Sequence, residues 1–368
     1  MRLFHPPSAS WPTETIVPLV PPGESAIGDG AETMALPLTA VDTAVGYRAE
    51  DDDITRSTRA DLRLWRLPGW LADWAELCKF RLTSLVLYTV VIGYVCGLAW
   101  QGNLSWNGEN KPPVDLGSGL WWTLLGTALL AAGASVLNQY LERDLDARMV
   151  RTQRRPLPTG RVRAESALAG GVVLALAGLG VLALATPPIT AWLGAATLAI
   201  YLGVYTPLKT RSTFNTLVGA VAGALPPLIG WSAASGGVDW PAGSLFLIQF
   251  LWQFPHFWSI AWLYREDYAR AGMQMVPVLD QSGRMTGRLL VNHCLVLVPA
   301  SFSPVLTGLG GTRYLVAAVV LGAAFLLTAW WFLLQPDRRR ARLVLWASLI
   351  YLPVLLTILA FDAMAMGE

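Results

Sequence analysis

The chain has little charge, few histidines and no paired cysteines. Of its 368 residues only 14% are charged and 54% are hydrophobic, whereas a soluble protein of this size carries about 25% charged residues. The cysteines and histidines lack the spacing of a disulfide framework or a metal site. They are Cys78, Cys96, Cys294, His5, His256 and His293. The net charge of +2 is unremarkable, and no nucleic-acid partner is expected.

The N-terminal region lacks any long apolar run. Residues 1–60 are rich in Pro, Gly, Thr and acidic side chains, without the apolar core of a signal peptide or the Arg-rich character of a transit peptide. We expect a disordered tail. Residues 61–81 mix Trp and Leu with Arg and Lys, which predicts an amphipathic segment along the membrane surface.

Apolar runs of about 20 residues fill the rest of the chain and predict membrane helices. The fold class is therefore all-α: a polytopic bundle of about nine transmembrane helices within 82–363, around a central cavity open to the cytoplasmic side. The count of nine depends on a split at 186–188, where two prolines interrupt one apolar block. The expected spans are 83–101, 118–141, 165–186, 189–206, 214–234, 243–263, 288–308, 314–334 and 343–362.

Basic residues are distributed unevenly between the loops. The loops on one side carry most of the Lys and Arg, whereas the opposite loops carry only Lys111 and, at a span edge, Arg313. By the positive-inside rule the basic loops are cytoplasmic, in a multi-pass protein of the cell inner membrane. They are 142–164, 207–213, 264–287 and 335–342.

Three oxygen-bearing side chains repeat at four-residue intervals where the second apolar run ends. Asn138, Glu142 and Asp146 drift only about 80° around a helix, so they line one face over roughly 12 Å. Mg²⁺ prefers carboxylate and phosphate oxygens. The spacing predicts an Mg²⁺ site; the competing interpretation is a helix end with i,i+4 salt bridges.

Basic residues follow this triad and recur in the next loop on the same side. They could bind the anion that a metal brings, or they could be ordinary anchors at the membrane surface. The candidates are Arg151, Arg154, Arg155, Lys209 and Arg211.

The fifth and sixth runs contain helix breakers and polar residues. Pro226 and Pro227 interrupt the fifth run, which predicts either a cavity or close helix packing. In the sixth run Gln253 and His256 flank Pro255, and polar groups at this depth are costly in lipid. A flat apolar ligand could bind there; alternatively His256 only satisfies a carbonyl that Pro255 leaves free.

An acidic face and cations at the mouth of an apolar bundle suit a prenyl diphosphate. A metal and Lys or Arg neutralise the departing diphosphate, which lets the allylic C–O bond ionise. A secondary transporter is the competing class, but its paired ionisable groups would lie near the midplane. Here the acids cluster at one end, which favours the enzyme.

The chain resembles the UbiA-type intramembrane prenyltransferase superfamily and, within it, the haem-farnesylating branch. The resemblance covers about residues 75–362. The stretches that carry it are 76–81, 138–156, 205–209, 215–231, 252–257, 267–272 and 275–277.

This resemblance implies transfer of the farnesyl group of farnesyl diphosphate to a vinyl group of haem B. Water adds, and haem O and diphosphate are the products. It also implies Mg²⁺ bound by Asn138, Glu142 and Asp146, with Asp267 as a further acidic ligand. It assigns diphosphate binding to Arg151, Arg154, Arg155, Lys209 and Arg211, a place near the allylic carbon to Tyr205, and haem contacts to Gln253 and His256.

Three positions depart from the family pattern. Glu142 stands where many members have Asp, Thr210 where Arg is common, and Ala271 where Asp would complete a second acidic motif. A complete second metal site is therefore not predicted. The alternative acceptor is a quinone precursor or chlorophyllide. The lipid bilayer and a haem A synthase are the expected partners besides the two substrates.

Overall fold

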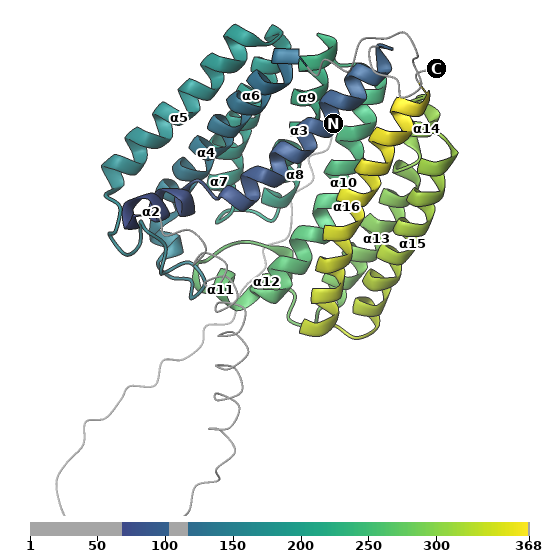
Figure 1. Ribbon diagram of the computed structural model, residues 1–368. Coiled ribbons are helices and arrows are strands. Elements are labelled where there is room, and N and C mark those ends of the chain that lie inside the picture. Colours follow the sequence, from purple (N-terminus) through teal and green to yellow (C-terminus); the bar gives the residue numbers. More distant parts are fainter. Residues whose placement is uncertain (1–67, 103–116, 367–368) are drawn as a thin grey trace, which may run out of the picture. The chain divides into compact units, whose positions relative to one another are not determined.

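The structure, a computed structural model, describes residues 68–102 and 117–366. Within these ranges every regular element is a helix (Figure 1). The predicted tail at 1–60 and the start of the predicted amphipathic segment lie outside the described residues. The elements are α2 (Gly69–Leu77), α3 (Phe80–Trp100), α4 (Gly117–Asp146), α5 (Ala164–Ala185), α6 (Pro188–Leu198), η1 (Ala199–Tyr205), α7 (Thr206–Leu208), α8 (Asn215–Ala224), α9 (Pro226–Ser235), α10 (Trp240–Leu263), α11 (Arg265–Arg270), α12 (Val276–Leu279), α13 (Arg284–Ala300), α14 (Ser303–Leu306), α15 (Thr312–Leu334) and α16 (Arg338–Met366).

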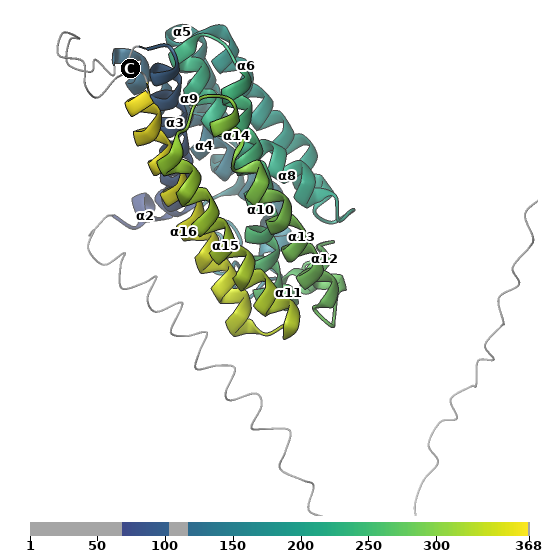
Figure 2. The same cartoon turned by 90° about the vertical axis from the view of Figure 1, so that its right-hand side faces the viewer.

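Eight helical segments of the described chain are long and apolar enough to cross a membrane. They coincide with eight of the nine predicted spans, with ends that differ by a few residues. Three of them are interrupted: α6, η1 and α7 form one span, α8 and α9 another, and α13 and α14 a third. Figure 2 shows α13, α15 and α16 packed side by side. The protein is an all-helical, multi-pass membrane protein, as predicted.

The remaining predicted span, 243–263, is α10, which is not among the eight apolar segments. Its 24 residues include Gln249, Gln253 and His256. These side chains are tolerated because α8, α13 and α16 pack around α10, so that protein rather than lipid faces them. Apolarity alone therefore counts eight spans in the described chain, and α10, with 24 residues, is long enough to be the ninth predicted span.

Two glycines bring α3 and α9 into backbone contact. A Cβ atom added to Gly93 would lie 2.0 Å from the Pro227 carbonyl oxygen, and one added to Gly230 would lie 1.9 Å from the Val90 carbonyl oxygen. Small residues permit such approach between membrane helices, where dispersion contacts drive association. The close helix packing that was one of the two predictions for the double proline is therefore confirmed at Gly230.

The charged loops gather at one end of the bundle. Figure 1 shows α2, α11 and α12 there. The Gln274 amide donates to the Lys209 carbonyl oxygen at 2.7 Å, and the Val150 amide donates to Asp267 Oδ1 at 3.1 Å. Three loops that are far apart in the sequence thus contact one another, as expected of loops on one side of the membrane.

Replacing Gly230 by Ala should destabilise the fold, because the added methyl group collides with the backbone of α3. We expect a loss of about 1–3 kcal/mol, typical of overpacking, visible as a lower melting temperature in detergent. Gly180→Ala in α5 is the control, since a Cβ there meets nothing within 4 Å. Equal melting temperatures for the two variants would contradict the close contact of α3 and α9.

Candidate active site

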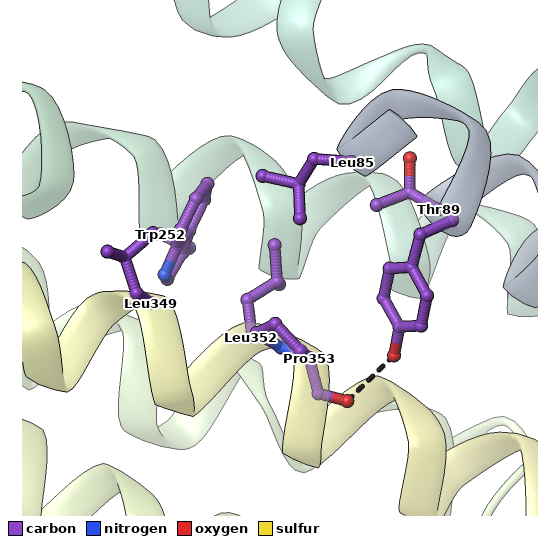
Figure 3. A pocket seen from close by; sticks show the side chains of 7 residues that line it. Leu85, Thr89, Trp252, Leu349, Leu352 and Pro353 are labelled. Atoms are coloured by element: carbon purple, nitrogen blue, oxygen red, sulfur yellow. Dashed lines mark hydrogen bonds between the residues drawn. The ribbon is translucent and has the colours of Figure 1, made fainter. Parts of the chain in front are cut away.

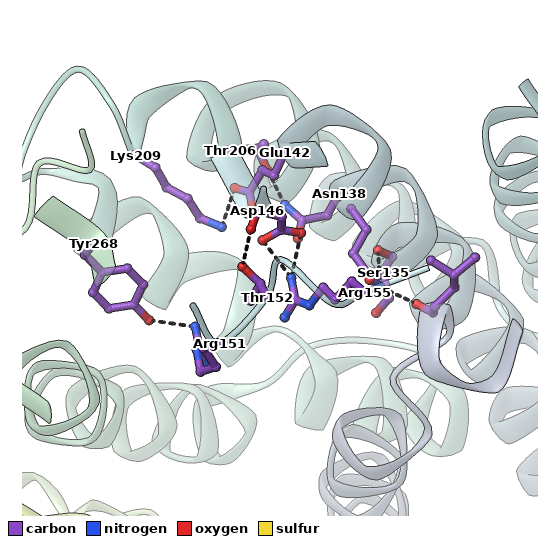
Figure 4. A network of polar contacts seen from close by, with 12 residues as sticks. Ser135, Asn138, Glu142, Asp146, Arg151, Thr152, Arg155, Thr206, Lys209 and Tyr268 are labelled. Atoms are coloured by element: carbon purple, nitrogen blue, oxygen red, sulfur yellow. Dashed lines mark hydrogen bonds and ion pairs between the residues drawn. The ribbon is translucent and has the colours of Figure 1, made fainter. Parts of the chain in front are cut away.

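The predicted acidic face exists and is buried. Asn138, Glu142 and Asp146 lie in the last turns of α4, and their exposed fractions are 1%, 5% and 1%. Figure 4 shows the three side chains directed into one polar network. Asn138 Nδ2 donates to Thr206 Oγ1 at 3.1 Å, so its oxygen Oδ1 remains for a cation. The one-face arrangement predicted from the spacing is confirmed.

Each carboxylate of this face is paired with a cation. Lys209 Nζ donates to Glu142 Oε1 at 2.6 Å. Arg155 Nη1 donates to both oxygens of Asp146, at 2.9 and 2.7 Å. Burial acts to lower the pKa of Lys209, but Tyr205 and Glu142 outweigh it and raise that pKa above its usual range. Lys209 is therefore held as an ammonium ion at neutral pH.

Two tyrosines of a π-helix form the wall beside Lys209. Tyr201 and Tyr205 belong to η1, and their ring centroids stack at 5.6 Å. The Lys209 ammonium lies 4.6 Å from the centroid of the Tyr205 ring. Thr206 Oγ1 donates to the Tyr201 carbonyl oxygen at 2.8 Å. This hydrogen bond gives a backbone acceptor of the π-helix a donor. Short π-helices of this kind frequently occur at functional sites.

Asp267 has partners other than the acidic face. Its carboxylate accepts hydrogen bonds from the Val150 amide at 3.1 Å and from the Arg151 amide at 3.3 Å, and it pairs with Arg270. In this structure Asp267 therefore joins the loop after α4 to α11. Its predicted role as an acidic ligand stays a prediction.

The other predicted cations differ in exposure and contacts. Arg151 is exposed, yet its guanidinium lies 4.7 Å from the Tyr264 ring centroid and donates to the Tyr268 hydroxyl at 3.3 Å. Arg154 and Arg211 are exposed at the same end of the bundle. Arg155 and Lys209 are thus joined to the acidic face, whereas Arg151 contacts tyrosine rings and Arg154 and Arg211 are exposed.

Gln253 and His256 lie within α10 and make no contact with the ion pairs. Gln253 Nε2 donates to the Ala220 carbonyl oxygen at 3.0 Å. His256 stacks on Trp252 at 4.6 Å, and its Nδ1 lies 2.8 Å from Ser348 Oγ in α16. The alternative interpretation, in which His256 satisfies a carbonyl freed by Pro255, does not match this hydroxyl partner.

A small apolar cavity lies beside Trp252, between α3, α10 and α16 (Figure 3). At its edge the Tyr88 hydroxyl donates to the Pro353 carbonyl oxygen at 2.7 Å. Its lining residues are Leu85, Tyr88, Thr89, Trp252, Leu349, Leu352 and Pro353.

Known proteins show what this arrangement belongs to. Residues 86–352 match the model of the UbiA prenyltransferase family. The chain belongs to the UbiA prenyltransferase family. A relative from Solibacter usitatus, named protoheme IX farnesyltransferase, is 46% identical over 292 residues, which cover 79% of this chain and 99% of the relative. The predicted membership, and with it an enzyme of prenyl transfer, is confirmed.

Solved structures share the fold of this family member at low sequence identity. A digeranylgeranylglyceryl phosphate synthase has a TM-score of 0.63 at 16% identity, with 80% of this chain and 98% of that chain covered. A UbiA homologue from Archaeoglobus fulgidus bound to DMAPP and Mg²⁺ has a TM-score of 0.56, also at 16% identity, with 80% and 99% covered.

The acidic face fits a magnesium ion that is shared with a substrate. Within the described residues no group of three or more His, Cys, Asp or Glu side chains could hold a metal by itself. The face offers two carboxylates and one amide oxygen. Mg²⁺ is commonly bound in this way, by one or two carboxylates together with phosphate oxygens and water.

Lys79 is a site residue that the sequence did not single out as a ligand. It precedes α3 with φ at +48°, a left-handed conformation that is rare outside glycine. Burial, followed by repulsion from Arg155 and Lys209, lowers its pKa from 10.5 to about 7, against the attraction of Glu142 and Asp146. In the sequence, Lys79 stood out only as part of residues 76–81, one of the stretches that carry the resemblance to the family.

Removing the Lys79 charge should stabilise the UbiA-family fold in a pH-dependent way. Because the pKa of Lys79 is about 7 folded and 10.5 unfolded, the unfolded chain binds the proton more tightly. The resulting penalty is complete below pH 7 and fades as the pH rises towards 10. Lys79→Met should therefore melt above wild type at pH 6, with a gap that shrinks by pH 9. A gap independent of pH would show that the ammonium is not the cause.

Proposed function

We propose that the protein transfers the farnesyl group of farnesyl diphosphate to a vinyl group of haem B, with addition of water, to give haem O and diphosphate. The observation that carries this proposal is the buried carboxylate face, whose acids pair with Lys209 and Arg155, at the end of an apolar bundle. The relative from Solibacter usitatus, which is named for this activity, supports haem as the acceptor.

The charged residues would hold the diphosphate at the loop end of the bundle. Asn138, Glu142 and Asp146 would bind Mg²⁺, which, when bound, neutralises charge on the diphosphate oxygens. Lys209 and Arg155 are already within hydrogen-bond distance of the same carboxylates, so they can exchange those oxygens for diphosphate oxygens. The surrounding cations Arg151, Arg154 and Arg211 would add to the positive potential.

The prenyl chain would extend past the tyrosine wall into the bundle. Tyr205 lies between the Lys209 ammonium and Gly219 of α8, where a Cβ would approach the ring to 2.7 Å. The ring is therefore held in place beside the allylic carbon. Its face stabilises positive charge as the C–O bond ionises, and the packed apolar surroundings exclude bulk water.

Haem would contact Gln253 and His256, on the α10 side of the site. The end of the bundle with the charged loops would face the cytoplasm, in a protein of the cell inner membrane, because basic loops are usually cytoplasmic. A haem A synthase, which would take up the product, is the proposed protein partner.

Asp146→Asn should lower haem O formation by about two orders of magnitude, because it removes charge that organises the diphosphate. The assay supplies membranes with haem B and farnesyl diphosphate and quantifies haem O, with 4-hydroxybenzoate and chlorophyllide as parallel acceptors. Asp144→Asn is the matched control, since this neighbouring side chain is 80% exposed. If the wild type forms prenylated 4-hydroxybenzoate and no haem O, haem is not the acceptor and the proposal is wrong.

Inorganic diphosphate should raise the melting temperature of the detergent-solubilised protein only when Mg²⁺ is present. A ligand that binds only the folded state stabilises it by mass action, and the proposed site needs both ions together. Chelation of Mg²⁺ should abolish the shift, and Asp146→Asn should not show it. An equal shift in the presence of chelator would mean that the cations alone bind the diphosphate.

A further inference from the structure

A break in the fifth span determines how one glutamine of α10 is oriented. Pro227 has no N–H, so it leaves the carbonyl oxygen of Gly223, four residues earlier, without its helical donor. Gln249 Nε2 donates to that oxygen at 2.8 Å. One turn along α10, Gln253 Nε2 donates to the Ala220 carbonyl oxygen at 3.0 Å. The two glutamines thus bind the backbone of α8 through their amide nitrogens.

This orientation leaves an acceptor without a donor. The amide of Gln249 cannot turn over, because its oxygen would then face the Gly223 carbonyl oxygen. Its Oε1 is buried without a hydrogen-bond partner in the described structure, and the residue is only 6% exposed. Of the four such side-chain atoms there, two are indole donors and one is a hydroxyl that can also donate. Gln249 Oε1 is the one pure acceptor.

Contacts along α8 connect Gln249 with the proposed reaction site. Tyr205, next to Lys209, packs on Gly219 of α8, and the following glycine on that helix face, Gly223, contacts Gln253. Gly223 is also the residue whose carbonyl binds Gln249. A continuous path of contacts therefore leads from the diphosphate end through the tyrosine wall to this amide.

The proposed reaction has one reactant that suits a buried acceptor. Farnesyl diphosphate reaches this depth only with its hydrocarbon chain, and the vinyl edge of haem has no N–H or O–H group. Water is the remaining reactant, and it donates. We propose that Gln249 Oε1 binds the water molecule that becomes the hydroxyl group of haem O. This inference rests on the proposed function and goes beyond it.

The step balances without a further reagent. The C–O bond to diphosphate breaks, the vinyl group forms a C–C bond to the allylic carbon, and positive charge moves to the carbon next to the porphyrin ring. The water oxygen forms a C–O bond to that carbon. Its proton leaves with the diphosphate, so Gln249 orients the water and does not act as its base. Without water, the same cation loses a proton and gives an unhydrated alkene.

The test is the ratio of haem O to unhydrated farnesyl haem, resolved by mass from the same turnover. Gln249→Met should lower this ratio about tenfold, the effect of one hydrogen bond on a rate. Gln249→Glu should restore much of it, because the neutral acid keeps an acceptor and an O–H donor for Gly223. Thr127→Val, which removes another buried orphaned atom, is the control and should leave the ratio unchanged.

The outcomes separate this inference from the proposed function. If wild type forms no farnesylated haem of either kind, the proposed function fails. If wild type forms haem O and Gln249→Met lowers both products equally, the amide has only a packing role and the inference is overturned. A changed ratio with an unaltered melting temperature supports the water site.

Discussion

The two buried ion pairs, Lys209 with Glu142 and Arg155 with Asp146, are the interaction on which the loop end of the bundle depends. A carboxylate that is removed from water without a counter-ion costs several kcal/mol, and both acids are less than 10% exposed. Arg155 comes from the loop after α4, and Lys209 directly follows α7, the short helix after the π-helix. The acidic face can therefore be buried only when both segments are in place. The same cations are the groups that an anionic substrate needs.

The polarity of α10 follows from a second constraint, the break between α8 and α9. A backbone carbonyl within the membrane must be satisfied by protein, and the double proline removes the donors that a regular helix would supply. Gln249 provides one to Gly223. Close contact of α3 with Gly230 covers the segment that follows the break. The polar side chains of α10 are thus part of what permits the break between α8 and α9.

The sequence was sufficient for the helices and the acidic face, because both depend on local periodicity. Apolar runs predicted nine spans, eight of which coincide with apolar helical segments of the described chain, and four-residue spacing placed Asn138, Glu142 and Asp146 together. Long-range contacts were out of reach. Lys79 enters the site because Gln139 Nε2 donates to the Leu77 carbonyl oxygen at 2.7 Å, a contact between residues 62 positions apart. His256 and its partner Ser348 are 92 positions apart, so no local pattern could predict their contact. The hydrogen bonds of Asp267 form only because the loop after α4 meets α11.

The charge of the site favours an anionic ligand. Glu142 and Asp146 are outweighed by Lys79, Arg155 and Lys209, so three positive charges face two negative ones when Lys79 is protonated. Asp267 and Arg270 cancel one another. Arg151, Arg154 and Arg211, which are exposed at the same end of the bundle, add to the positive potential. This excess would attract a diphosphate, and a divalent cation bound with it would reach the two carboxylates that now hold Arg155 and Lys209. The ion pairs that allow the acidic face to be buried therefore also prepare it for an anion that arrives with a metal.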